Sequence, residues 1–156
     1  MGAADATPAC VADADRLGEL LAEQGWIVLT GGRPFGVMEA ASRGAKRVSG
    51  SLTIGILPTA DEVPSAFVDV AIRTDLGHGR NNVNVLTSDV VFACGVGGPG
   101  TASEVALAVK NGRPVVLVAP TDAAERFFTE LGAGRVRVVR SAEEAAAIAQ
   151  AFLTSR

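Results

Sequence analysis

The stretch that most constrains the fold is residues 88–110, where an apolar run, a cluster of glycines and a helical pattern follow one another. The run 90–94 is short and bounded by turn residues, which is typical of a strand buried on both faces. Strand, glycine turn and helix in this order aim backbone N–H groups at an anion. We therefore expect the turn at residues 95–100 to form the floor of a ligand site.

Two side chains after this turn, Thr101 and Glu104, also fit a purely structural interpretation. Their spacing is that of a capping box, in which Thr caps the helix and Glu reaches back to the cap N–H. Ser141 and Glu144 repeat the spacing with no glycine loop in front of them. A cap requires none of the four glycines in residues 95–100, so the ligand site is the favoured interpretation.

A second glycine loop, residues 30–36, follows the apolar run 26–29. Its three glycines either cradle a ligand or form a tight turn between strand and helix, and Arg33 is either an anion clamp or a solvated side chain. In parallel sheets, ligands bind at the carboxyl ends of the strands. Because both glycine loops follow strands, we expect them to face the same rim of the sheet.

Apolar runs alternate with helical patterns along the chain, which predicts an α/β fold with a doubly wound parallel sheet in three layers. No linker or repeat divides the 156 residues, so we expect a single domain, 1–156. The expected strands are 26–29, 52–57, 67–72, 90–94, 114–118 and, at a sheet edge, 135–139, and the expected helices are 8–24, 37–46, 80–87, one ending at 110, 123–131 and 141–153.

The order of these elements lacks the strand with which a doubly wound fold normally starts. Residues 1–4 resemble the turn after a strand, and a helix follows directly. Either the chain starts earlier or the sheet does without this strand. If the strand belongs at the sheet centre, its absence leaves backbone groups unpaired there.

Composition narrows the class of protein and its partners. The chain is 48% hydrophobic with few aromatics, and this apolar excess indicates subunit contacts, so we expect a homo-oligomer, a dimer or a tetramer. A net charge of -3 without a basic run argues against nucleic acid, and no apolar run approaches the ~20 residues of a membrane span. No signal peptide is visible. The two cysteines stand in no metal-type spacing, so we expect free thiols and a cytoplasmic location.

Four stretches together resemble one family, the molybdenum cofactor carrier proteins. They are residues 30–38, 53–58, 80–84 and the Gly-Pro-Gly-Thr-Ala-x-Glu run within 98–108. The resemblance extends over nearly the whole chain. It implies a Rossmann-like fold, a homo-oligomer and a surface pocket that holds the pterin-based molybdenum cofactor.

A sister group within this superfamily is the "Lonely guy" cytokinin-activating phosphoribohydrolases, formerly labelled lysine decarboxylase-like. Their motif Gly-Gly-x-Gly-Thr-x-x-Glu is complete at residues 97–104. In those enzymes a Glu and an Arg hydrolyse the N-glycosidic bond of a nucleotide, and Glu104 and Arg80 match them. Their Met-x-x-Arg-Lys is replaced by Gly77, Arg80 and Asn81, and Arg33 stands where they have a third glycine. These departures favour a carrier and leave hydrolysis open.

The main expectation is therefore a carrier, rather than an enzyme, for a small anionic, phosphate-bearing ligand, by resemblance the molybdenum cofactor. Arg80 suits a phosphate because guanidinium grips anions in a forked geometry, and Glu104 would cap the helix. One alternative is a nucleoside 5′-monophosphate phosphoribohydrolase with Arg80 and Glu104 as catalytic residues. Another is a nucleotide-sensing or structural oligomer. No structural metal is expected, because His78 lacks partners at ligand spacing. The expected ligand contacts are Gly31, Gly32, Arg33, Gly36, Arg80, Asn81, Gly97, Gly98, Gly100 and Thr101.

Overall fold

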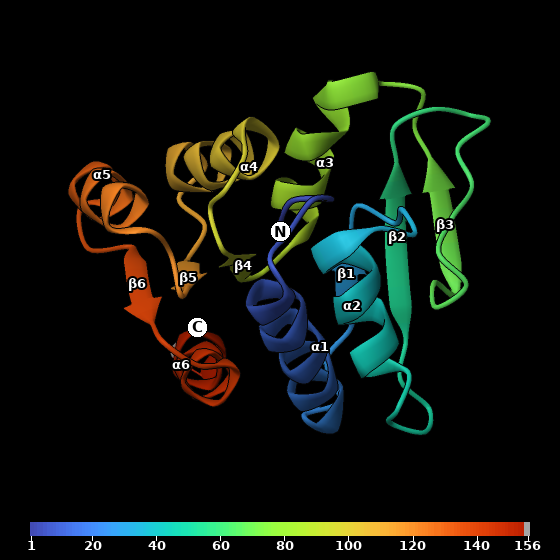
Figure 1. Cartoon of the computed structure of the whole chain (residues 1–156), viewed down its shortest axis with the longest axis horizontal. Helices are drawn as coiled ribbons and strands as arrows, with labels where there is room; N and C mark the ends of the chain where they lie inside the picture. Colours follow the sequence, from blue (N-terminus) through green and yellow to red (C-terminus); the bar gives the residue numbers. More distant parts are fainter. Residues whose placement is uncertain (155–156) are drawn as a thin grey trace.

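A computed structural model describes residues 1–154, in which α-helices alternate with parallel strands (Figure 1). The helices are α1 (Pro8–Glu23), α2 (Gly36–Ala45), α3 (Arg80–Thr87), α4 (Pro99–Lys110), α5 (Asp122–Gly132) and α6 (Ala142–Thr154), with a 3-10 turn η1 (Gly77–Gly79), and the strands are β1 (Val28–Thr30), β2 (Thr53–Leu57), β3 (Val70–Arg73), β4 (Val91–Cys94), β5 (Val115–Val118) and β6 (Val136–Val139).

Helices cover both faces of the strands, which confirms the Rossmann-like α/β fold (Figure 1). One hydrophobic cluster joins α1, α2 and α6 to Val116 and Val118 of β5. The other joins residues of α3, α4 and α5 to Val115 and Leu117. Side chains of a strand alternate between its two faces. All four residues of β5 are buried for this reason, as the apolar run predicted.

The strands form two separate three-stranded parallel sheets, in the orders β1-β2-β3 and β4-β5-β6, and not one continuous sheet. The predicted position of β6 at an edge is confirmed. Between the two sheets, the amino group of Met1 donates to the carbonyl of Phe92, and the carbonyl of Met1 accepts from the N–H of Cys94 at 3.0 Å. Met1 is thus paired with Ala93 in the manner of a parallel strand.

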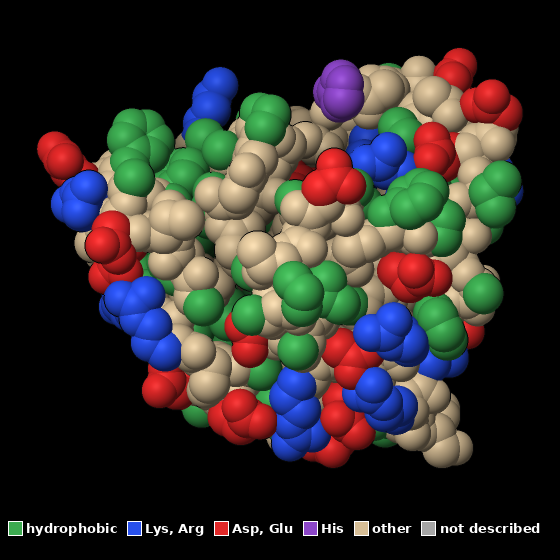
Figure 2. All heavy atoms as spheres, viewed as in Figure 1, with side chains coloured by type: hydrophobic (Ala, Val, Ile, Leu, Met, Phe, Trp, Pro, Cys, Tyr) green, Lys and Arg blue, Asp and Glu red, His purple; other side chains and the backbone are tan. Residues whose placement is uncertain are grey.

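The first two helices touch backbone to backbone. A Cβ atom on Gly18 would lie 2.0 Å from the carbonyl oxygen of Ala41, and one on Gly44 would lie 1.8 Å from that of Asp15. The carboxylate of Asp15 also pairs with Arg43 at 2.8 Å. Figure 2 shows charged side chains of both signs gathered over the lower ends of α1 and α2. The N-terminal segment is held against the start of α2 by a separate bond, from the N–H of Val37 to the carbonyl of Ala3 at 3.3 Å.

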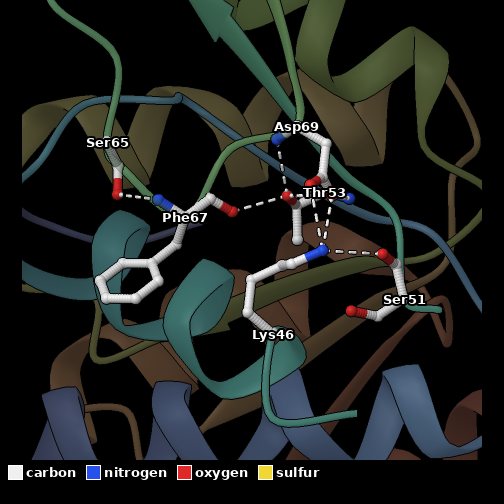
Figure 3. A network of polar contacts seen from close by, with 6 residues as sticks. All are labelled: Lys46, Ser51, Thr53, Ser65, Phe67 and Asp69. Atoms are coloured by element: carbon white, nitrogen blue, oxygen red, sulfur yellow. Dashed lines mark hydrogen bonds and ion pairs between the residues drawn. The ribbon is translucent and has the colours of Figure 1, made fainter. Parts of the chain in front are cut away.

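A polar network replaces the first residues of the expected strand 67–72, so β3 begins only at Val70 (Figure 3). The carboxylate of Asp69 accepts from the N–H of Thr53 at 2.8 Å and from the ammonium of Lys46 at 3.0 Å. The Thr53 hydroxyl lies 2.6 Å from the carbonyl oxygen of Phe67. Asp69 therefore fastens the start of β2 to the end of α2 and to the segment before β3.

The contacts of Asp69 make a prediction about stability and pH. The N–H of Thr53, and after it Lys46, holds the pKa of Asp69 below its usual value. We expect Asp69→Ala to lower the free energy of unfolding by about 1 kcal/mol near neutral pH, since solvent weakens these charged hydrogen bonds. A depressed pKa stabilises the fold above the unfolded value of ~3.9 and ceases to do so as the pH falls through the folded value.

The measurement is urea unfolding of wild type and variant at neutral pH and in acid. The matched control is Glu130→Ala, which removes an exposed carboxylate from α5. A stability difference for Asp69→Ala that equals the control's at neutral pH, or that grows in acid, would contradict the prediction.

Candidate functional site

A cavity of about 360 Å³ lies where the two glycine loops meet, past the carboxyl ends of β1 and β4. Residues 1–5 and the start of α2 form further walls. The two loops thus share one rim, although they are far apart in sequence. The predicted ligand contacts that line this cavity are Gly31, Arg33, Arg80, Asn81, Gly97, Gly98, Gly100 and Thr101, and Glu104 lines it as well.

Arg80, the first residue of α3, is a buried cation in this cavity. It exposes 8% of its surface, and its Nη1 has no hydrogen-bond partner among the described residues. Burial lowers the pKa of its guanidinium, the Glu104 carboxylate opposes this effect, and the neighbouring Arg33 adds to it. The guanidinium groups of Arg80 and Arg33 therefore share the site with the carboxylates of Glu104 and Asp5. Arg33 and Arg80 repel each other, and an anion bound beside them would relieve this repulsion.

At Gly31 the backbone passes directly against this guanidinium, and a side chain here would displace it. A Cβ atom there would lie 2.2 Å from Nη1 of Arg80 and 2.6 Å from the sulfur of Met38. Contacts this short force neighbouring atoms to move. The first glycine loop thus acts as a wall that holds Arg80 in the cavity.

In the second loop, no close contact explains the glycines at positions 97, 98 and 100. A Cβ atom on Gly97, Gly98 or Gly100 would meet nothing within 4 Å, and Gly98 has an ordinary extended φ of -150°. Neither packing nor backbone conformation requires a glycine at Gly98. A helix leaves its first N–H groups without intrahelical partners, and no side chain caps α4. The glycines therefore keep the N-terminus of α4 open toward the cavity.

The capping-box interpretation of Thr101 and Glu104 is wrong, and so is the expectation that Glu104 caps the helix. Because α4 starts at Pro99, Thr101 lies inside its first turn, and its hydroxyl is buried without a partner among the described residues. Glu104 exposes 6% of its surface and accepts from the side-chain amide of Asn84 at 3.2 Å.

The second example of the spacing behaves differently. The N–H of Glu144 donates to the Ser141 hydroxyl at 3.2 Å, and the Glu144 carboxylate accepts from the N–H of Arg140 at 2.9 Å. Ser141 and Glu144 thus form hydrogen bonds at the N-terminus of α6. The same four-residue spacing serves a helix terminus in one place and a cavity in the other.

Buried polar atoms without partners concentrate around this cavity. Such atoms are costly unless a ligand or water completes their hydrogen bonds. Three belong to lining residues and one to Asn84, which bonds to the lining residue Glu104; a fifth, Ser51 Oγ, does not belong to the cavity lining. Within residues 1–154 the four atoms are Arg33 Nε, Arg80 Nη1, Asn84 Oδ1 and Thr101 Oγ1.

Gly32 and Gly36 are not part of the cavity lining. Gly32 has a φ of +74° and passes close to Gly55, and Gly36 has a φ of +52° with the carbonyl oxygen of Ala4 2.3 Å from where a Cβ would be. Both are therefore needed for the turn itself. Asn81 faces the cavity and donates to the hydroxyl of Ser103 at 3.0 Å.

Three parts of the lining were not among the expected ligand contacts. His78 stands at the exposed rim, purple in Figure 2. Met38 is buried, as a core residue would be, yet also touches the cavity. Residues 2–5 carry only small side chains apart from Asp5, and their sequence gave no indication of a ligand contact. In the described chain, no group of three His, Cys, Asp or Glu side chains is placed to hold a metal.

Known proteins resemble this chain both in sequence and in fold. A sequence profile of the SLOG cluster4 family matches residues 1–148. The solved molybdenum cofactor binding protein of Rippkaea orientalis is 47% identical over 98% of this chain and 94% of its own, with a TM-score of 0.92. The Moco carrier protein of Chlamydomonas reinhardtii is 46% identical over 100% and 96%, with a TM-score of 0.93.

An uncharacterized protein of Archaeoglobus fulgidus is 45% identical over 105 residues, 67% of this chain and 68% of its own length. None of the described helices combines the length and the apolarity that crossing a bilayer requires.

Because Arg80 and Glu104 are buried charges in the cavity, we expect them to lower the free energy of unfolding. We expect the double variant Arg80→Met, Glu104→Gln to raise the free energy of unfolding by about 1 kcal/mol, because replacing buried charges with groups of similar size is often stabilising. Removing both charges leaves neither one buried alone, and Gln keeps an acceptor for Asn84. Denaturant unfolding without ligand is the measurement.

Arg126→Met, an exposed arginine on α5, is the control and is expected to change stability by less than about 0.5 kcal/mol. A double variant that is clearly less stable than wild type would mean that Arg80 is held by favourable contacts within the protein and does not await an anion.

Proposed function

The chain belongs to the SLOG cluster4 family, and from this premise we propose that it binds the molybdenum cofactor and stores or transfers it. The observation that carries the proposal is the buried Nη1 of Arg80, which has no hydrogen-bond partner within residues 1–154 and lies beside the uncapped N-terminus of α4. A bound anion would accept hydrogen bonds from both. The two solved relatives at 46% and 47% identity are named for binding or carrying this cofactor.

The residues fit an anionic organic ligand better than a bare metal ion. The phosphate of the cofactor would be held by the first-turn N–H groups of α4 and by Arg80, because helix N-termini and guanidinium both favour phosphate. Arg33 would add charge from the other loop. Thr101 and Asn81 offer neutral polar atoms to the rest of the ligand. Among the described residues, no group of metal-ligating side chains lies together, so the protein would hold the cofactor by its organic part.

The glycine floor supplies the direct test. We expect the purified protein to bind molybdenum cofactor and to protect it from oxidation. Gly98→Val would fill the open floor and weaken binding at least about tenfold, while the melting temperature without ligand changes by less than about 2 °C, since a Cβ there meets nothing. Fluorescence titration with the cofactor and a cofactor-transfer assay measure the two effects.

Arg126→Met again provides a control with wild-type binding expected. If wild type neither binds nor protects the cofactor, the proposed function is wrong. If Gly98→Val binds as tightly as wild type, the ligand does not occupy the glycine floor.

The phosphoribohydrolase alternative remains because Arg80 and Glu104 line the same cavity. Incubation of the protein with a nucleoside 5′-monophosphate tests it. The carrier proposal predicts no free base from AMP or isopentenyl-AMP. Base released by wild type and lost in Glu104→Gln would replace the carrier function with hydrolysis.

We also propose that the protein is a cytoplasmic homo-oligomer. Its two cysteines are free thiols, which fits a reducing compartment. Val70 and Ile72 on the edge strand β3 are 43% and 44% exposed, and Leu76 and Leu86 are exposed as well. Exposed apolar groups on an edge strand favour contact with a second copy.

Analytical ultracentrifugation tests the assembly. We expect wild type to sediment as an oligomer and Ile72→Lys to shift it toward the monomer, because a charge would be buried in the contact. Leu131→Lys on α5 is the matched control, with 48% exposure. A monomeric wild type, or equal effects of the two substitutions, would argue against this contact.

A further inference from the structure

The carboxylate of Glu104 lies in the ligand cavity without the capping role that its spacing predicted. It lines the cavity, exposes 6% of its surface and makes no cap for α4. Nη1 of Arg80 has no hydrogen-bond partner within residues 1–154, so the carboxylate does not accept from this nitrogen either. A buried carboxylate is costly unless hydrogen-bond donors surround it. Glu104 is therefore a candidate for a contact with the ligand.

Asn84 of α3 fixes the position of this carboxylate. Figure 1 shows α3 beside α4, and the side-chain amide of Asn84 donates to Oε1 of Glu104 at 3.2 Å in a buried contact. Asn84 itself is fully buried. A carboxylate has about four acceptor sites. The amide of Asn84 occupies one of them, so it orients the side chain and leaves Glu104 able to accept from a molecule in the cavity.

The cavity presents hydrogen-bond donors and acceptors in different places. Arg33 and Arg80 offer guanidinium donors, and the first-turn N–H groups of α4 add others. Glu104 follows Gly100 by four residues, so it lies on the same face of α4, about 6 Å further along the helix axis. A phosphate bound at the donors cannot satisfy Glu104, because phosphate oxygens are themselves negatively charged acceptors. The ligand must therefore bring N–H or O–H donors of its own to this carboxylate.

Two parallel N–H groups are the donors that fit a carboxylate best, as the forked pairing of guanidinium with carboxylate shows. An aminopyrimidinone ring has such a pair, because its ring N–H and its amino group lie side by side. Pterins and guanine both contain this ring. Adenine places its amino group beside a ring nitrogen that accepts, and this nitrogen would face the carboxylate without a proton between them. The chemistry of Glu104 therefore favours a pterin or guanine over adenine.

We propose that Glu104, positioned by Asn84, binds the aminopyrimidinone edge of a pterin and so selects the organic part of the ligand. Arg80 and the N-terminus of α4 would hold the phosphate at the other end. This inference rests on the proposed function, because the pterin is that of the molybdenum cofactor. A guanine nucleotide carries the same edge, and the test separates the two sources.

The test compares ligands that differ in this edge alone. The full chain is titrated by calorimetry with the phosphate ester of hydroxymethylpterin and with its lumazine counterpart, in which an oxygen replaces the amino group. Inorganic phosphate and GMP are titrated in parallel. The variant is Glu104→Gln, because Gln keeps an oxygen for the Asn84 amide but turns an NH₂ group toward the donors of the ligand.

Two control variants remove a negative charge without changing the proposed contact. Asp5→Asn removes an exposed carboxylate from the lining of the same cavity. It is expected to shift the affinities for the pterin and lumazine esters by the same factor. Glu130→Gln removes an exposed carboxylate from α5 and is expected to bind as wild type does.

The proposal predicts that wild type binds the pterin ester at least about tenfold more tightly than the lumazine ester, since a site built for hydrogen bonds rejects an analogue that lacks them. Glu104→Gln is expected to lose this preference by weakening the pterin ester at least about tenfold. Binding of inorganic phosphate is not weakened, because the variant removes a negative charge. GMP is expected to bind less tightly than the pterin ester.

Equal affinity of wild type for the two esters, or a preference that persists in Glu104→Gln, would overturn the proposal. A preference lost equally in Asp5→Asn would do the same, because charge and not the hydrogen bond would then be responsible. Tighter binding of GMP would overturn the pterin as the source of the edge. A wild type that binds molybdenum cofactor without preferring the pterin ester leaves the proposed function standing. A wild type that prefers the pterin ester but does not bind the cofactor removes that function and keeps the role of Glu104.

Discussion

The buried guanidinium of Arg80 is the constraint on which the charged cavity depends. A buried charge costs several kcal/mol unless groups of opposite charge and hydrogen-bond acceptors surround it. Glu104 supplies part of this compensation and is itself held by Asn84. Gly31 lacks a side chain so that the backbone can lie against the guanidinium. What remains uncompensated is a cation beside an uncapped helix N-terminus, and an anion completes both.

The scaffold brings these groups together through its parallel strands. β1 and β4 end at the same rim, so the loops that follow them meet there although they are far apart in sequence. Met1 is paired with Ala93 at the free edge of β4, and residues 2–5 continue from it along the cavity wall. This pairing therefore anchors one wall of the ligand site. Stability of the sheet and shape of the site are linked through this one residue.

The sequence was sufficient for the fold class, the parallel strands and the shared rim, because these depend on local periodicity and on the position of glycines after strands. It was insufficient where two patterns look alike and tertiary contacts decide. Thr101 and Glu104 have the spacing of Ser141 and Glu144, but Asn84 from another helix takes Glu104 away from the cap. The split of the sheet and the contacts of Asp69 likewise depend on distant segments.

The most direct measurement of the central claim is a crystal structure of the protein grown with molybdenum cofactor. The account predicts the phosphate of the cofactor within hydrogen-bond distance of the guanidinium of Arg80 and of the first-turn N–H groups of α4. A cofactor bound elsewhere, or bound here with its phosphate turned to solvent and Arg80 still unpaired, would contradict it.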